Sequence, residues 1–327
     1  MSDQVRVGVI GTSAYADSTH LPNLKSHAGV QIAAICGRNR ARAQEMADKY
    51  AIPMVYTDYR QMLEQGDLDA VVIAATDDLH YPMTMDALDA GLHVLCEKPL
   101  ALSAQQAQAM TEKARTKGVK HMTFFAWRFE AFHRYLHKLV GEGYIGRPYL
   151  CQFRQVGGYG RDGLYAWRFD TQHGNGILGD LGSHMIDLAH WLVGDISRVS
   201  AHLVTSVERM GADGQPLRTP ANDSALLTVE FANGACGAIV VSAMAHMAER
   251  EQFHEISLYG EDGTLELNTS SIAVQMRGVR KGQTEFETLT VPDELRMEVD
   301  LSPPRSPRSE TPDRSASAAG NRAPSPG

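Results

Sequence analysis

The feature that most constrains the fold is an alternation, up to about Phe125, of short apolar runs with longer stretches of helical period. The short runs are rich in valine and isoleucine, which is typical of strands buried on both faces. They predict strands over residues 6–10, 32–36, 70–75, 93–97 and 120–125. Apolar residues recur every three to four positions in the stretches between, which predicts amphipathic helices. The pattern indicates an α/β domain with a doubly wound parallel sheet and crossover helices.

The pattern changes after Phe125. An apolar stripe over residues 132–140 predicts one more helix, and glycines and a proline over residues 143–148 then break the chain. From Val199 onward, alternating segments such as 224–231 and 237–242 are joined by turn residues. We therefore expect a C-terminal α+β domain with an open, mainly antiparallel sheet. The expected domains are residues 1–125 for dinucleotide binding, 126–300 for substrate binding and oligomerisation, and 301–327 as a tail.

The tail has an unusual composition. Residues 301–327 contain six of the 14 prolines of the chain, six serines and four arginines, but only one leucine and no aromatic residue. Such a segment buries too little apolar surface to offset the entropy of ordering, so we expect it to be disordered.

Composition excludes several classes of protein. The 327 residues have a formal net charge of −8, which argues against a nucleic-acid partner. No apolar run reaches the ~18 residues of a membrane span, and no signal peptide is evident, so we expect a cytoplasmic protein without a membrane partner. The four cysteines are scattered singly and the 13 histidines form no ligand motif, so we expect neither disulfides nor a metal.

A glycine turn follows the first predicted strand. The segment from Gly11 to Ala16 fits the pattern G-x-G-x-x-[GA], with Ser13 in place of the second glycine. In this pattern the first glycine allows a sharp turn, and small residues let the backbone approach a pyrophosphate at a helix N-terminus. Small residues also occur in such turns for packing alone. The candidate cofactor-binding residues here are Gly11, Thr12, Ser13 and Ala14.

The end of the second strand indicates which dinucleotide binds. NAD enzymes usually place an acidic residue there to bind the ribose hydroxyls, whereas this chain has Gly37-Arg38-Asn39-Arg40 and no acid before Glu45. Arg38 or Arg40 can pair with a 2′-phosphate, so NADP is favoured over the alternative, NAD. Both arginines could instead be solvated residues at the start of a surface helix. Arg38 and Asn39 complete the candidates in this segment.

Three further motifs complete a family pattern. Glu97-Lys98-Pro99 ends a predicted strand, residues 75–80 read Ala-Thr-Asp-Asp-Leu-His, and residues 179–187 read Gly-Asp-Leu-Gly-Ser-His-Met-Ile-Asp. With the glycine turn, these motifs resemble the Gfo/Idh/MocA family of NAD(P)-dependent sugar and polyol oxidoreductases. The resemblance extends from about Val5 to Asn268. It implies a Rossmann fold for the first domain.

The resemblance also implies roles for individual residues. His184 matches the proton-accepting base, Asp180 would orient it or hold a second substrate hydroxyl, and Lys98 would hydrogen-bond the reacting oxygen. The Lys98–Pro99 bond is typically cis in the family. Further cofactor contacts are implied for Ala75, Thr76, His80, Glu97 and Lys98. Considered separately, Asp180 and His184 could be only a surface pair four residues apart on a helix, and Asp187 is better explained as a structural hydrogen-bond partner.

Substrate contacts are expected from aromatic and hydrogen-bonding side chains before the His184 motif. Sugar sites combine aromatic faces with hydrogen-bond donors. The candidates are Arg128, Tyr159, Trp167 and Arg168. A buried aromatic cluster at the domain junction would show the same pattern.

These expectations define one leading function and its alternatives. The leading function is hydride transfer between NADP or NAD and a hydroxyl-bearing carbon of a sugar, inositol or related polyol. A noncatalytic NAD(P)-binding sugar sensor on the same fold is the alternative, and an enzyme that retains its cofactor between two sugars is a third possibility. The resemblance implies a homodimer or homotetramer paired through the sheet. It also implies a closing C-terminal helix, which this sequence lacks and which we expect to have been lost.

Overall fold

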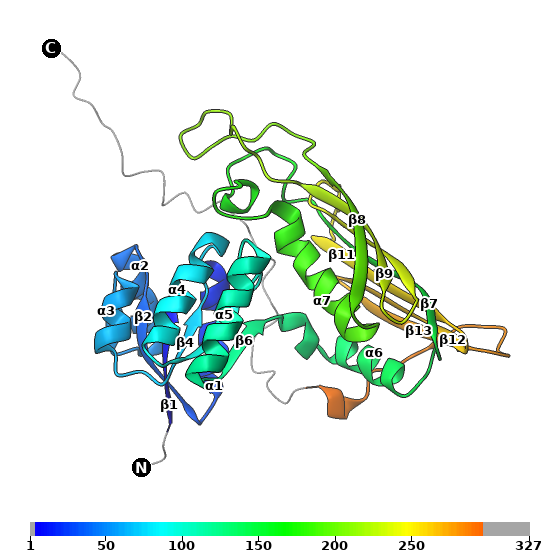
Figure 1. Cartoon of the computed structure of the whole chain (residues 1–327), viewed down its shortest axis with the longest axis horizontal. Helices are drawn as coiled ribbons and strands as arrows, with labels where there is room; N and C mark the ends of the chain where they lie inside the picture. Colours follow the sequence, from blue (N-terminus) through cyan, green and yellow to red (C-terminus); the bar gives the residue numbers. More distant parts are fainter. Residues whose placement is uncertain (1–3, 297–327) are drawn as a thin grey trace. The chain divides into compact units, whose positions relative to one another are not determined.

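The computed structural model describes residues 4–296 of the chain. These form two compact units (Figure 1). Among the described residues, the first unit contains residues 4–126 together with Gln172–Gly174, and the second contains Trp127–Thr171 and residues 175–296. The predicted disorder of residues 301–327, and the missing helix there, lie outside the described residues.

The first unit is built on a six-stranded parallel sheet of order β3-β2-β1-β4-β5-β6, which confirms the Rossmann prediction. The strands are β1 (Val5–Ile10), β2 (Val30–Cys36), β3 (Met54–Tyr56), β4 (Ala70–Ile73), β5 (His93–Glu97) and β6 (His121–Phe124). The sequence did not predict β3, because this edge strand is a run of only three half-buried residues.

Helices connect these strands. They are α1 (Leu21–Ser26), α2 (Arg40–Tyr50), α3 (Tyr59–Gln65), α4 (Asp77–Asp89) and α5 (Ala104–Lys117), and a π-helical turn, Ala16–His20, precedes α1. Ser103 caps α5, since its Oγ accepts from the Gln106 backbone N at 3.2 Å, and Gly118 ends the helix at a positive φ of 68°. The reciprocal bond of a full capping box is missing, because Gln106 Oε1 has no partner among the described residues.

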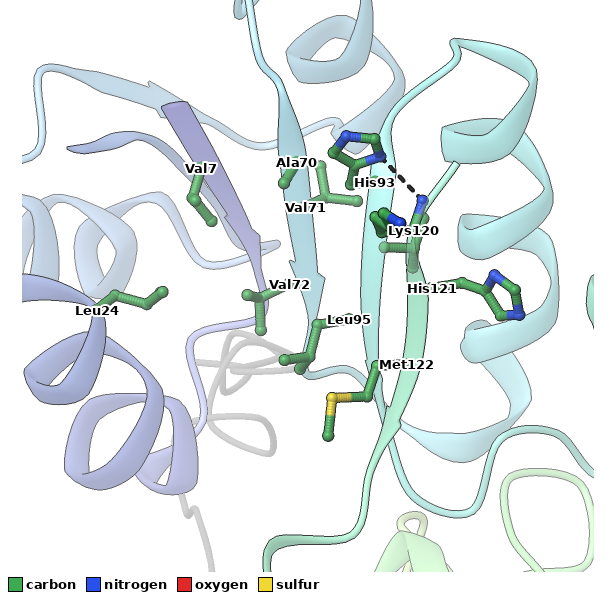
Figure 2. A pocket seen from close by; sticks show the side chains of 11 residues that line it. Val7, Leu24, Ala70, Val71, Val72, His93, Leu95, Lys120, His121 and Met122 are labelled. Carbon is green, nitrogen blue, oxygen red and sulfur yellow. Dashed lines mark hydrogen bonds between the residues drawn. The ribbon is translucent and has the colours of Figure 1, made fainter. Parts of the chain in front are cut away.

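The helices of this unit are divided unevenly between the two faces of its sheet. Right-handed crossovers place α1 and α2 on one face, whereas α3, α4 and α5 pack against one another on the other. Within residues 4–296, no helix of this unit therefore covers β4, β5 and β6 on the first face, where a pocket of about 240 Å³ lies (Figure 2). Val72, Leu95 and Met122 project into it from adjacent strands, and Met122 is 40% exposed.

The second unit is built on an eight-stranded sheet of order β14-β13-β12-β11-β7-β10-β9-β8. Its strands are β7 (Pro148–Gly157), β8 (Ile196–Val204), β9 (Ser224–Phe231), β10 (Cys236–Ser242), β11 (Gln252–Gly260), β12 (Gly263–Ser270), β13 (Val274–Arg280) and β14 (Glu287–Thr288). Only β7 and β10 pair in parallel, so the prediction of a mainly antiparallel sheet is confirmed.

Helices cover the inner face of this sheet (Figure 1). They are α6 (Ala131–Gly141) and α7 (Ser183–Leu192), with 3₁₀ turns at Ala126–Phe129, Trp167–Phe169 and Asp293–Leu295. The sequence predicts one α-helical run through residues 180–184, but a π-helical turn, Leu178–Gly182, precedes α7. Met185, Leu188 and Ala189 of α7 are fully buried in the core of the unit. This packing fixes the helix that presents His184.

Candidate active site

The glycine turn of the first unit is tightly enclosed. Gly11 has a φ of 126°, its N–H donates to Cys36 O at 2.9 Å, and a Cβ at this position would lie 2.2 Å from Ala74 O. Only glycine fits there. Ser13 Oγ accepts from Ala16 N at 3.2 Å and so caps the helical segment that begins at Ala14. The result is a strand, turn and helix N-terminus of the kind that binds a pyrophosphate.

Arg38 and Arg42, in the segment after β2, have different surroundings. A Cβ on Gly37 would lie 2.4 Å from the Thr12 side chain, so this segment passes directly against the glycine turn. Asn39 Oδ1 accepts from the backbone N of Arg42 at 3.1 Å and caps α2. Arg42 itself pairs with two carboxylates. Arg38 is exposed, and within residues 4–296 no carboxylate forms an ion pair with it.

The loop after β4 is linked to the residue that follows Lys98. His80 is fully buried, with Nδ1 2.7 Å from Pro99 O and Nε2 3.2 Å from Ala75 O. Burial lowers the pKa of His80, so the neutral ring is favoured, and a neutral imidazole donates through one nitrogen only. Thr76 occupies the N-cap position of α4. The neutral His80 ring can therefore donate to one of these two carbonyls and only packs against the other, so it lies between the two candidate segments.

A buried carboxylate precedes Lys98 at the end of β5. Glu97 is 7% exposed, and its Oε1 lies 2.7 Å from His20 Nε2. Its Oε2 accepts from the backbone N of Lys98 at 3.2 Å. The Lys98–Pro99 peptide bond is cis, as the resemblance implies. Glu97 and His20 together anchor the backbone from which Lys98 extends.

In the second unit, Asp180 is held by two of the expected substrate residues. Tyr159 donates its hydroxyl to Asp180 Oδ2 at 2.7 Å, and Arg168 Nε lies 3.2 Å from the same oxygen. The Arg168 guanidinium also lies over the Tyr159 ring at 5.6 Å and over the Trp167 ring at 5.4 Å. The four residues form one cluster, although 21 residues separate Tyr159 from Asp180. The Tyr159 hydrogen bond and the Arg168 guanidinium charge together fix the direction of the Asp180 carboxylate.

His184 lies in the first turn of α7 and is 7% exposed. Its ring stacks on Trp127, with 4.0 Å between ring centroids and 12° between planes. Trp127 lies in the 3₁₀ turn Ala126–Phe129, shortly after β6, and belongs to the second unit. Stacking at this distance restricts rotation of the imidazole.

Arg128 is engaged elsewhere. Its Nε and terminal nitrogen bind the two oxygens of Asp187 at 2.8 and 2.6 Å, and its guanidinium lies 5.5 Å from the Trp191 ring centroid. This bidentate pair gives Asp187 the structural role that the sequence favours for it. It also occupies two of the five N–H groups that Arg128 could offer to a substrate.

The structure thus groups the candidates within each unit. The first unit contains the glycine turn, Arg38, the loop after β4, Glu97 and Lys98, and the second contains the Asp180 cluster and His184. Sequence reasoning missed His20, Trp127, His133 and His254. Trp127 is adjacent to Arg128 and could have been considered for that reason, but nothing in the sequence connects His254 of β11 to a helix 70 residues earlier.

Residues 4–296 contain neither a metal-ligand cluster nor a membrane-spanning helix. No group of three histidine, cysteine or acidic side chains is arranged to hold a metal ion. No helix in that range has both the length and the apolar character needed to cross a bilayer.

Comparisons with known proteins agree with this geometry. The model of the oxidoreductase family with an NAD-binding Rossmann fold, Gfo/Idh/MocA, matches residues 5–125, and the Gfo/Idh/MocA C-terminal domain matches residues 133–266. An uncharacterized oxidoreductase of Synechocystis is 32% identical over 304 residues, which cover 90% of this chain and 81% of the relative. D-glucoside 3-dehydrogenase of Escherichia coli is 31% identical over 240 residues, which cover 71% and 68%.

A solved structure shows the same architecture with ligands bound. Levoglucosan dehydrogenase in complex with NADH and levoglucosan superposes with a TM-score of 0.78 at 27% identity, covering 88% of this chain and 80% of that one. Two family models together match most of the chain. The chain therefore belongs to the Gfo/Idh/MocA family of NAD(P)-dependent oxidoreductases.

Proposed function

We propose that this protein transfers a hydride between NADP and a hydroxyl-bearing carbon of a sugar, inositol or related polyol. The observation that most supports this is the cluster around Asp180, a carboxylate with a fixed direction beside aromatic faces and a guanidinium. Such a set accepts and donates hydrogen bonds to several hydroxyls at once. Relatives named for sugar substrates are consistent with it.

The proposal gives each side chain one task. In alcohol oxidation the hydroxyl proton moves to His184, whose ring titrates near neutrality in its ordinary state. Lys98 hydrogen-bonds the same oxygen and stabilises the charge that develops on it. Asp180 accepts a hydrogen bond from a second hydroxyl and so orients the ring. Bound NADP would supply the acceptor for the hydride that leaves the carbon.

The proposed substrate residues are those expected from the sequence, but we assign them different roles. Tyr159 and Arg168 act through Asp180, which they hold. Trp167 offers an aromatic face to the apolar side of a sugar ring. We expect Arg128 to act mainly by fixing α7 through Asp187.

Kinetics on a panel of sugars and polyols, followed by nicotinamide absorbance, tests the function. We expect His184→Ala and Lys98→Ala each to lower kcat by roughly 10² or more with folding intact. Asp180→Ala should raise KM as well as lower kcat. His190→Ala is a matched control, because His190 lies on the same helix but is half exposed and pairs with Asp195. Near-normal turnover in both the His184 and Lys98 variants would contradict the assigned roles.

The preference for NADP rests on Arg38. Titration of the cofactors should show tighter binding of NADP than of NAD. Arg38→Ala should reduce this preference about tenfold, as expected for loss of one charge-assisted phosphate contact of ~1 to 2 kcal/mol. Arg42→Ala removes the same charge nearby, but Arg42 is already paired, so its variant should keep the preference. Equal affinities, or tighter NAD, would overturn the assignment.

We also propose a homodimer or homotetramer. The large sheet exposes Leu150 of β7 and Leu226 of β9, which are 40% and 45% exposed, and in the strand register Val240 of β10 stands between Leu226 and Arg154 of β7. Apolar residues at such positions are typical of a contact surface. Analytical ultracentrifugation tests this, and a monomer at micromolar concentration would contradict it.

A further inference from the structure

A stack of rings, formed by half-buried Trp127 and two buried histidines, lies next to His184 in the second unit. Trp127 is parallel to His184 on one side, and its centroid lies 5.1 Å from His254 and 6.1 Å from His133. The two histidines lie 5.1 Å apart with 17° between their planes. Three rings from α6, β11 and the 3₁₀ turn thus lie behind the one ring that the proposed chemistry uses.

Hydrogen bonds hold this stack in place. His133 is fully buried, and its Nδ1–H donates to the Trp127 carbonyl at 2.9 Å. The His254 ring contacts Thr269 Oγ1 at 2.8 Å, across the β11–β12 pair. Trp127 is therefore fixed through its backbone on one side and by packed rings on the other. It gives His184 a rigid surface to stack on.

The charges around His184 also affect how stable a protonated His184 ring would be. Burial and then the nearby His133 lower the pKa of His254 to about 3, so His254 is neutral at physiological pH. On the α7 side, Asp180 is held by Tyr159 and Arg168, and Asp187 is paired with Arg128. At neutral pH, the His254 ring therefore adds no positive charge behind Trp127.

We propose that Trp127 is a positioning residue that holds the His184 ring and stabilises its protonated form. The inference rests on the proposed role of His184. A cation stacked on an indole is attracted by the negative face of the ring, and the attraction is stronger in a buried site. The imidazolium formed when His184 accepts a proton gains this interaction, and the neutral ring gains less. Trp127 thus favours proton acceptance by the base.

The direct test is an NMR titration of the His184 ring protons in the free protein, assigned by their loss in His184→Gln. We expect Trp127→Leu to lower the His184 titration midpoint by about half a pH unit, since removing a favourable contact with the cation lowers the pKa. Trp127→Phe should restore part of the shift, because phenylalanine keeps an aromatic face. Trp191→Phe changes a tryptophan that stacks on His137 instead, so it should leave the midpoint unchanged.

A second measurement covers the case in which Trp127→Leu does not fold. In a Trp167→Phe, Trp191→Phe background, Trp127 is the one remaining tryptophan of the three in the chain. Protonated imidazole quenches indole fluorescence, so emission should fall on acidification with the midpoint found for His184 by NMR. Adding His184→Gln should abolish this fall, and adding His133→Asn should not.

Kinetics then separate the inference from the proposed function. We expect Trp127→Leu to lower kcat about tenfold with little change in KM, and to move the rising limb of the pH profile to lower pH. If His184→Ala is inactive while Trp127→Leu keeps the wild-type kcat and titration midpoint, the inference fails and the proposed function stands. If His184→Ala retains turnover, the proposed function fails, and the titration still decides whether Trp127 stabilises the imidazolium.

Discussion

The two groups of candidate residues are held in different ways. In the first unit, the site residues are held mainly by backbone atoms: Gly11 is enclosed by Cys36 O and Ala74 O, and the His80 ring lies between the carbonyls of Ala75 and Pro99. In the second unit, the site residues are held by side chains that are far apart in the sequence: Tyr159 and Arg168 hold Asp180. We therefore expect substitutions in the first unit's site residues to disturb the backbone, and substitutions in the second unit's site residues to alter the chemistry while the fold stays intact.

Gly11→Ala is expected to have the largest effect. Its new Cβ would clash with the Ala74 carbonyl at a φ that alanine rarely adopts, so the turn must move. We expect a loss of ~3 kcal/mol in stability and about 100-fold weaker cofactor binding. Gly91→Ala is the control, because it also has a positive φ but nothing within 4 Å of the new Cβ. Thermal unfolding and cofactor titration that gave equal losses for both variants would refute the argument from close approach.

His254 should produce the next largest effect, and it depends on pH. Its pKa is about 3 in the fold and 6.5 in the unfolded chain, so below pH 6.5 the unfolded state binds the extra proton and stability falls. At pH 5 the loss is about 2 kcal/mol. Denaturant unfolding at pH 7 and pH 5 should show a smaller decrease in His254→Gln than in the wild type. The same decrease in both proteins would mean that His254 does not control the pH response.

Tyr159→Phe tests whether the second group can lose a contact without loss of fold. The variant removes the hydroxyl that binds Asp180 but keeps the ring packed near Phe169. We expect KM to rise about tenfold, which corresponds to one hydrogen bond to a charged group, with little change in melting temperature. Tyr149→Phe, at an exposed position on β7, should change neither quantity. A large fall in stability for Tyr159→Phe would place this residue with the backbone-supporting group.

Ser103→Ala is expected to have the smallest effect. It removes the side-chain cap of α5 and should lower stability by about 1 kcal/mol without changing cofactor affinity. Gln106→Ala should have almost no effect, because the Gln106 side-chain oxygen makes no reciprocal bond in the described structure. Equal losses for both variants in chemical denaturation would show that the full capping box forms.

Much of the first unit could be predicted from the sequence. The strand at residues 93–97 was predicted at its observed bounds, and the glycine turn and the residues at strand ends are short motifs whose meaning depends on near neighbours. β3 was missed because three half-buried residues at a sheet edge make no periodic pattern. The π-helical turn before α7 was missed because an i+5 hydrogen-bond pattern has no distinct hydrophobic period.

The sequence by itself determined the alternating α/β pattern, the family motifs and the residue types available for chemistry, because these depend on local spacing. Only the tertiary structure decided that Arg128 binds Asp187, that Tyr159 and Arg168 hold Asp180, and that His184 stacks on Trp127. These contacts join residues that are 12 to 59 positions apart on different elements. No local rule relates such positions, because the packing of helices on the large sheet sets which side chains meet.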